Sequence, residues 1–168
     1  MHYIVDSDKS FHEATVDLEA VVPRLGFVIL QVHDLGDVLR RKGIERDEDC
    51  RVFEICNFRQ TGRLLSIAMR LSLALPWRIS VFTENGVTRI GLIRPPPMLV
   101  ALSENAELSQ LAREIDEKMM QIVDETPDFR FKGRPGGGKA PADFPGPAFN
   151  AQRPADHQFG GIAAQLRG

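Results

Sequence analysis

One cysteine in the sequence stands where a protein could lower its pKa. Cys56 ends an alternating run that predicts a strand, and Asn57 directly after it is a residue type that caps helices. Unpaired N–H groups at a helix N-terminus stabilise a thiolate, and Arg59 would add a positive charge one turn away. Cys56 is therefore a candidate nucleophile. It also fits a second interpretation, a small buried side chain, which is how most free cysteines behave.

The same segment supplies the parts of a binding site for a small anion. In an antiparallel sheet the end of one strand lies beside the start of the next, so Trp77 would lie near Cys56. Helix N–H groups and arginine side chains bind anions, and an indole would hold an apolar part of the ligand. The predicted ligand-binding residues are Cys56, Asn57, Arg59, Arg63, Trp77 and Arg78.

Metal and nucleotide chemistry has little support in the sequence. His2, His12, His33 and His157 show no ligand spacing, and no C-x-x-C, H-E-x-x-H or phosphate-binding loop occurs. His33 and Cys50 would approach each other if their strands pair antiparallel, but two ligands do not make a zinc site. We therefore expect no metal and no cofactor.

The composition is that of a globular chain with room for one ordinary core. The 168 residues are 43% hydrophobic and 26% charged, with a formal net charge of −2, which does not indicate nucleic-acid binding. The longest nearly apolar run, residues 64–77, is interrupted by Arg70 and is shorter than the ~20 residues that span a bilayer. The N-terminus has no basic region followed by an apolar segment, so we expect a cytoplasmic protein with reduced cysteines and no membrane partner.

The C-terminal part of the chain differs in composition from the rest. Residues 127–168 carry six basic and three acidic residues, whereas residues 1–126 carry 15 and 20. Proline and glycine are frequent there and no helical or alternating periodicity occurs, so we expect a domain of residues 1–125 and a disordered tail of residues 126–168. The tail is either a variable extension or a segment that binds a protein partner. Such a partner would contact Phe129, Phe131, Phe144, Phe149 and Phe159.

The predicted elements begin with a strand at residues 2–5 and a helix introduced by a capping box. Ser10 and Glu13 have the S-x-x-E spacing, and apolar residues then recur at helical spacing. Residues 27–33 form a nearly continuous apolar run rich in β-branched residues, which predicts a central strand. Asp34 caps a short helix, and a solvated acidic loop leads to a third strand at residues 50–57.

A helix predicted over residues 59–73 is apolar over more than half of its circumference. One small sheet cannot cover such a helix, so we expect a homodimer. Arg59, Arg63 and Arg70 lie within about 60° of each other on the remaining side. This basic stripe fits a solvated face as well as an anion-binding or partner-facing one.

Asn85-Gly86 predicts a two-residue type I′ turn that joins strands at residues 77–84 and 87–94. The register places one set of alternating side chains in the core and puts Phe82 opposite Arg89 on a mixed face. That second face fits a ligand floor, a dimer surface or a solvated surface.

The order of the predicted elements indicates the fold class. Without two short connecting helices, and with an amphipathic helix after Asn105, the order is β-α-β-β-β-β-α. It predicts an α+β two-layer sandwich, in which an antiparallel sheet of about five strands carries two long helices on one face.

Residues 50–99 resemble a known family, domain of unknown function 302. The matching residues are Cys56-Asn57, residues 73–76, Arg78, Asn85-Gly86 and Pro95. The resemblance covers residues 1 to about 125 and implies a TATA-box-binding-protein-like topology, found as dimers, with no assigned activity. Trp77 stands where many members have a second cysteine, and Arg94 precedes Pro95 where many have aspartate.

Two classes of function remain open from the sequence. The first is a non-enzymatic dimeric module that binds a small ligand or a partner near Cys56, Arg59 and Trp77. The second is a thiol-dependent enzyme or redox sensor that uses Cys56. We favour the binding module.

Overall fold

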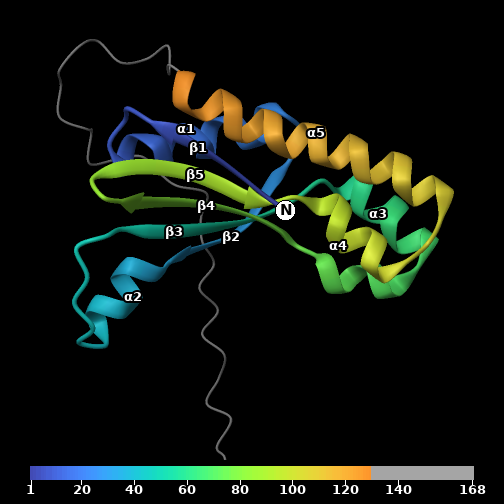
Figure 1. Cartoon of the computed structure of the whole chain (residues 1–168), viewed down its shortest axis with the longest axis horizontal. Coiled ribbons are helices and arrows are strands. Elements are labelled where there is room, and N and C mark those ends of the chain that lie inside the picture. The colour runs from blue at the N-terminus through green and yellow to red at the C-terminus, as the bar shows by residue number, and fades with distance from the viewer. Residues whose placement is uncertain (130–168) are drawn as a thin grey trace, which may run out of the picture. The chain divides into compact units, whose positions relative to one another are not determined.

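The computed structural model describes residues 1–129, which form a five-stranded antiparallel sheet with helices on one face (Figure 1). The order of strands in the sheet is β1-β5-β4-β3-β2. The strands are β1 (His2–Ser7), β2 (Val28–Asp34), β3 (Cys50–Cys56), β4 (Trp77–Glu84) and β5 (Val87–Ile93). The helices are α1 (Phe11–Arg24), α2 (Leu35–Arg41), α3 (Phe58–Ile67), the 3₁₀ helix η1 (Met69–Ala74), α4 (Pro95–Leu102) and α5 (Ala106–Asp128). The α+β two-layer class predicted from the sequence is confirmed.

The long helices α1 and α5 make up the layer that covers the sheet. The predicted capping box starts α1, because the Glu13 N–H donates to Ser10 Oγ at 3.3 Å and the Ser10 N–H donates to Glu13 Oε2 at 3.1 Å. Asn105 caps α5 by accepting the N–H of Glu107 at 2.8 Å. Both helices bury the apolar stripe that their spacing predicts. Its fully buried members are Ala14, Leu18, Val21 and Val22 of α1 and Leu108, Leu111, Ala112, Ile115, Met119, Ile122 and Val123 of α5.

The hairpin of β4 and β5 has the predicted turn and register. Asn85 and Gly86 have φ values of 53° and 79°, and Glu84 lies opposite Val87. The helix-covered face of the hairpin is buried. Within the part of the chain that the structure describes, no helical layer covers its opposite face, which carries Phe82 and Arg89 (Figure 1).

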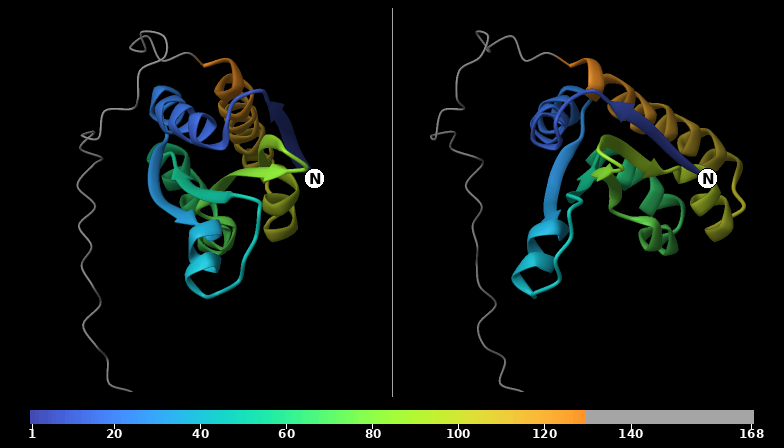
Figure 2. Two further views of the ribbon diagram at one scale, coloured as in Figure 1. Left: turned by 90° about the vertical axis from the view of Figure 1, so that its left-hand side faces the viewer. Right: turned by 60° about the vertical axis from the view of Figure 1, so that its left-hand side comes forward.

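β2 is an edge strand, not the central strand that its apolar run predicts. Among residues 1–129 it pairs only with β3, and Val28, Leu30 and Val32 are 43%, 47% and 38% exposed. An apolar run indicates that the side chains of a strand favour burial. It does not indicate whether they are covered by the rest of the same chain or by another molecule. Beyond β2, the chain continues into α2, which extends away from the helical layer (Figure 2).

The single helix predicted over residues 59–73 is two elements. Ala68 has an extended φ of −163° and separates α3 from η1. The break lets Leu64 of α3 and Leu71 of η1 both reach the core, where each is fully buried. Arg70 leaves the predicted basic stripe, because its Nε donates to the carbonyl of Leu102 at 2.6 Å. Tertiary packing has therefore overridden the continuous helical periodicity.

Helix α4, which begins with three consecutive prolines from Pro95, was not predicted from the sequence. Proline is tolerated in the first helical turn, where N–H groups have no helical partner in any case. Arg94 just before α4 binds Asp116 of α5, with Nη2 2.5 Å from Oδ2. This ion pair ties the start of α4 to the long helix.

Helix α5 continues to Asp128, past the predicted domain boundary at residue 125. Thr126 is fully buried, and Phe129 packs against the core with its ring centroid 5.1 Å from the guanidinium carbon of Arg24. The rest of the predicted tail lies outside the described residues, with Phe131, Phe144, Phe149 and Phe159 as its proposed contacts. Within residues 1–129, no helix is both long enough and apolar enough to span a bilayer.

Candidate functional site

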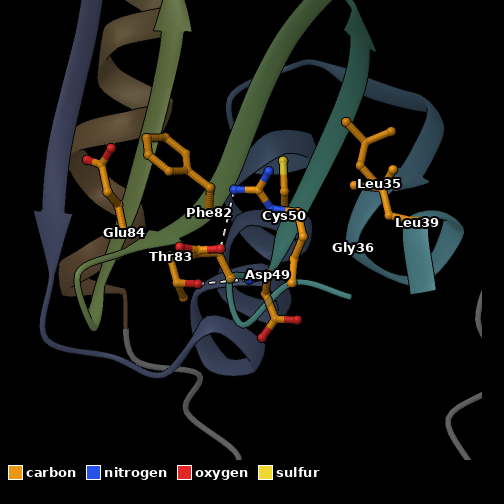
Figure 3. A pocket seen from close by; sticks show the side chains of 10 residues that line it. Leu35, Gly36, Leu39, Asp49, Cys50, Phe82, Thr83 and Glu84 are labelled. Carbon is orange, nitrogen blue, oxygen red and sulfur yellow. Dashed lines mark hydrogen bonds and ion pairs between the residues drawn. The ribbon is translucent and has the colours of Figure 1, made fainter. Parts of the chain in front are cut away.

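A hollow of about 370 Å³ opens where α2 leaves the sheet, on the face that α1 and α5 do not cover (Figure 3). Small-molecule sites begin at about this size. The floor of the hollow is apolar. Cys50 and Phe82 lie opposite each other on β3 and β4, and Leu35 and Leu39 of α2 lie across from them.

Asp34 fixes the position of α2 and hence the shape of the hollow. Its Oδ1 accepts the N–H of Asp37 at 2.9 Å and caps the helix, while its Oδ2 accepts Nε and Nη2 of Arg51 at 3.0 and 2.6 Å. Burial raises the pKa of the Asp34 carboxyl, but the hydrogen bonds from Asp37 and Arg51 outweigh it and hold that pKa below its ordinary value. Asp34 is therefore charged at neutral pH and joins α2 to β3.

Charged side chains form the rim of the hollow. Arg46, Glu48 and Asp49 come from the loop before β3, and Glu84 comes from the end of β4. The loop is held to the sheet by Thr83, whose Oγ1 accepts the Asp49 N–H at 2.8 Å and whose N–H donates to the Asp49 carbonyl at 3.0 Å. These backbone-anchored contacts keep the acidic loop beside the apolar floor.

Cys50 contributes a neutral thiol to the floor. Burial raises the pKa of this thiol, and the charge of Asp34 raises it further, so the nucleophilic thiolate is disfavoured. The predicted approach of His33 to Cys50 is not seen. His33 lies opposite Val52 and places Nε2 3.3 Å from Glu54 Oε1.

Trp77 and Cys56, two residues of the predicted anion site, point to opposite sides of the sheet. Trp77 lies opposite Ile55 on the core face and is 2% exposed. Side chains alternate along a strand, so Cys56 next to Ile55 points to the other face. Within residues 1–129, the indole Nε1 of Trp77 has no hydrogen-bond partner. Trp77 is therefore a core residue and does not line an open site with Cys56.

Cys56 is enclosed between β3 and the helix that follows it. It is 6% exposed, and its Sγ lies 3.1 Å from Oγ1 of Thr61. Asn57 caps α3 as predicted, because its Oδ1 accepts the N–H of Gln60 at 3.0 Å. Its Nδ2 also donates to the carbonyl of Gly26 at 3.0 Å. These contacts favour the packing interpretation of Cys56 over the nucleophilic one.

The three predicted arginine ligands differ in their contacts. Arg63 pairs with Glu114 at 2.9 Å, and hydrogen bonds from Gln110 and from Arg63 hold the pKa of Glu114 below its ordinary value. Arg59 and Arg78 are exposed, and their side chains make no hydrogen bond or ion pair with other residues in the range 1–129. Binding of an anion by these residues stays a prediction.

The fold and the hollow define an α+β domain with one sheet face left open. The chain belongs to the family described as domain of unknown function DUF302, whose sequence profile matches residues 3–126. It is similar to the crystal structure of an uncharacterised conserved DUF302 protein from Bacillus stearothermophilus, with 28% sequence identity and a TM-score of 0.69. That similarity covers 74% of this chain and 97% of the other. The comparison with curated proteins gave no match. The family resemblance of the sequence is thus confirmed.

Sequence reasoning did not select the hollow. The available signals were Phe82 on the mixed face of the hairpin, and Leu35 and Leu39 four residues apart on a short helix. Neither the position of Phe82 nor the spacing of the two leucines predicts that α2 lies beside the ends of β3 and β4. That placement depends on tertiary contacts of Asp34 and Thr83, which no local pattern reports.

Proposed function

We propose that this domain is a non-enzymatic homodimeric module that binds a small ligand in the hollow beside α2. The observation that carries the proposal is the hollow itself, which combines an apolar floor with a charged rim on the uncovered sheet face. The burial of Cys56 and the raised pKa of Cys50 support a binding role over thiol chemistry.

A neutral amphipathic probe tests the binding site. We expect 2-phenylethanol, titrated to ~20 mM to cover weak binding, to shift backbone amide NMR signals of Leu39, Cys50 and Phe82. Phe82→Ala should weaken this binding about tenfold, because an aromatic contact contributes up to ~1.5 kcal/mol. Ile93→Ala is the matched control, since Ile93 is an exposed apolar residue of β5 outside the hollow. Shifts spread evenly over the sheet, or an equal effect of the two variants, would contradict the assignment.

The dimer is supported by the conflict between the sequence and the position of β2. An apolar, β-branched strand is typical of a sheet interior, yet β2 lies at an edge with Val28 and Leu30 half-exposed. Charged residues or proline ordinarily protect such an edge, and residues 28–32 contain neither. Antiparallel pairing of β2 with β2 of a second copy would give this strand two neighbours and cover its apolar side chains.

Sedimentation velocity of the full chain tests the dimer. We expect the wild type to sediment with the mass of two chains and Leu30→Lys to sediment as a monomer, because the lysine would place like charges together across the two-fold axis. Val100→Lys introduces the same charge at an exposed apolar residue of α4 and should leave the dimer intact. A wild-type chain that is monomeric at every concentration would refute this part of the proposal.

A further inference from the structure

The hollow presents carboxylate oxygens to which residues 1–129 donate no hydrogen bond. Its lining includes three carboxylates, Glu48, Asp49 and Glu84, and one guanidinium, that of Arg46. Each carboxylate uses one oxygen for an arginine. Glu48 Oε2 lies 3.4 Å from Arg46 and Asp49 Oδ1 lies 3.4 Å from Arg40, while Glu84 Oε2 binds Arg89.

The second oxygen of each of these carboxylates accepts no hydrogen bond from residues 1–129. Arg40 and Arg46 are 47% and 56% exposed, and exposed ion pairs hold their partners weakly. The residues that line the hollow carry three negative charges and one positive charge, while Arg40 and Arg89, the partners of Asp49 and Glu84, lie outside its lining. The wall therefore favours a group that carries positive charge and N–H donors.

The floor selects the rest of the ligand. Leu35, Leu39 and Phe82 supply apolar surface, and the thiol of Cys50 stays neutral because burial raises its pKa. A cation near the Phe82 ring would also gain from the negative potential of the aromatic face. The guanidinium of Arg46 lines the same hollow, so one organic cation, a side chain of the protein, already lies there.

We propose that the hollow takes an organic cation, a protonated amine or guanidinium attached to an aromatic or aliphatic body. The carboxylates of Glu48, Asp49 and Glu84 receive the N–H groups, and the apolar body lies on Phe82 and the leucines of α2. Arg46 competes with the ligand for Glu48. This inference rests on the proposed binding function and names its ligand class.

Three probes of one shape separate charge from apolar contact. They are 2-phenylethylammonium, 2-phenylethanol and 3-phenylpropionate, each titrated into the full-length chain with backbone amide NMR signals as the readout. We expect the cation to bind at least about fivefold more tightly than the alcohol, the ratio that one favourable exposed charge contact gives, and the anion to bind most weakly. Salt at 0.5 M should remove most of the preference for the cation.

Substitutions at the rim should change the affinity for the cation alone. Asp49→Asn should weaken binding of the cation about fivefold and leave the alcohol unaffected, whereas Arg46→Ala should strengthen binding of the cation by removing its competitor. Arg41→Ala is the matched control, because Arg41 pairs with Asp37 on α2 and does not line the hollow. Amide signals of β1 and α5 show whether each variant keeps its fold.

The outcomes separate this inference from the function on which it rests. Binding of the alcohol without preference for the cation, a preference for the anion, or no effect of Asp49→Asn would overturn the ligand class and leave the binding site standing. Absence of binding by all three probes would overturn both.

Discussion

Asp34 should contribute more to stability than any neighbouring carboxylate, because one side chain both caps α2 and holds Arg51 of β3. Loss of a helix cap costs about 1 kcal/mol. Charge-assisted hydrogen bonds contribute ~1.5–3 kcal/mol when buried, which we reduce to about 1 kcal/mol because the two side chains are 32% and 27% exposed. Asp34→Ala should therefore lower the free energy of unfolding by about 2 kcal/mol, which corresponds to a fall in Tm of roughly 5–10 °C for a domain of this size.

Two further variants separate the cap from the charge. Asparagine caps helices as well as aspartate does, so Asp34→Asn should lose only the part due to Arg51, about half of the effect. Asp37→Ala removes an exposed ion pair with Arg41 on the same helix and should cost less than ~1 kcal/mol. Urea unfolding followed by circular dichroism measures all three.

The pH dependence gives the charge an independent signature. The pKa of Asp34 is lower in the folded chain than its unfolded value of about 3.9, so the stabilisation is fully present above that value and is lost as pH falls through the folded pKa. The difference between the wild type and Asp34→Asn should be constant from about pH 5 to pH 8 and should shrink below about pH 4. An Asp34→Ala variant as stable as Asp37→Ala, or a difference that grows toward low pH, would refute the reasoning.

Two substitutions, a labelling experiment and a truncation test the packing. Gly91→Ala should destabilise the chain by about 1–3 kcal/mol in urea unfolding, because the new Cβ would lie 2.7 Å from Ile4 Cγ1. Gly62→Ala should instead stabilise α3 by about 0.5–1 kcal/mol, because a Cβ at this position would meet no atom of residues 1–129 within 4 Å. Iodoacetamide followed by mass spectrometry should label Cys50 before Cys56, and equal rates would show that Thr61 and β3 do not enclose Cys56. A chain that ends at Thr126 should melt a few degrees below one that ends at Phe129, because it lacks the ring that packs on the core and under Arg24, a contact of about 1 kcal/mol. Identical melting temperatures would assign Phe129 no role in the fold.

The sequence predicted helix caps and turns correctly where contacts between residues close in sequence determine the local structure. The capping box at Ser10, the caps at Asp34 and Asn57 and the turn at Asn85-Gly86 each depend on contacts within a few residues, and each is present. The helical periodicity did not predict the break at Ala68. The break allows Leu71 to be buried in the core, and this tertiary contact leaves no mark in the local sequence.

The candidate site was harder to predict than the fold. Alternation along β3 and β4 is enough to separate Cys56 from Trp77, once the register Ile55 opposite Trp77 is known. The sequence supplies the register of the hairpin through its turn, but it supplies no such marker for the pairing of β3 with β4. The hollow depends on that pairing, because Cys50 meets Phe82 only in this register.

The pairing of β1 with β5 has a consequence for the order in which the chain folds. In the sheet formed by residues 1–129, the first strand has β5 as its single neighbour, and His2 lies opposite Ile93. During synthesis, β1 therefore remains unpaired until β5 has been made. The apolar side of α1 stays uncovered by its partner helix until α5, which comes later in the chain, has been made. Contacts between such distant parts of a chain slow folding and leave apolar surface open to other molecules in the meantime. The N-terminal half of this domain therefore keeps apolar surface exposed until the C-terminal half has been made, and α5 is the element that ends this exposure.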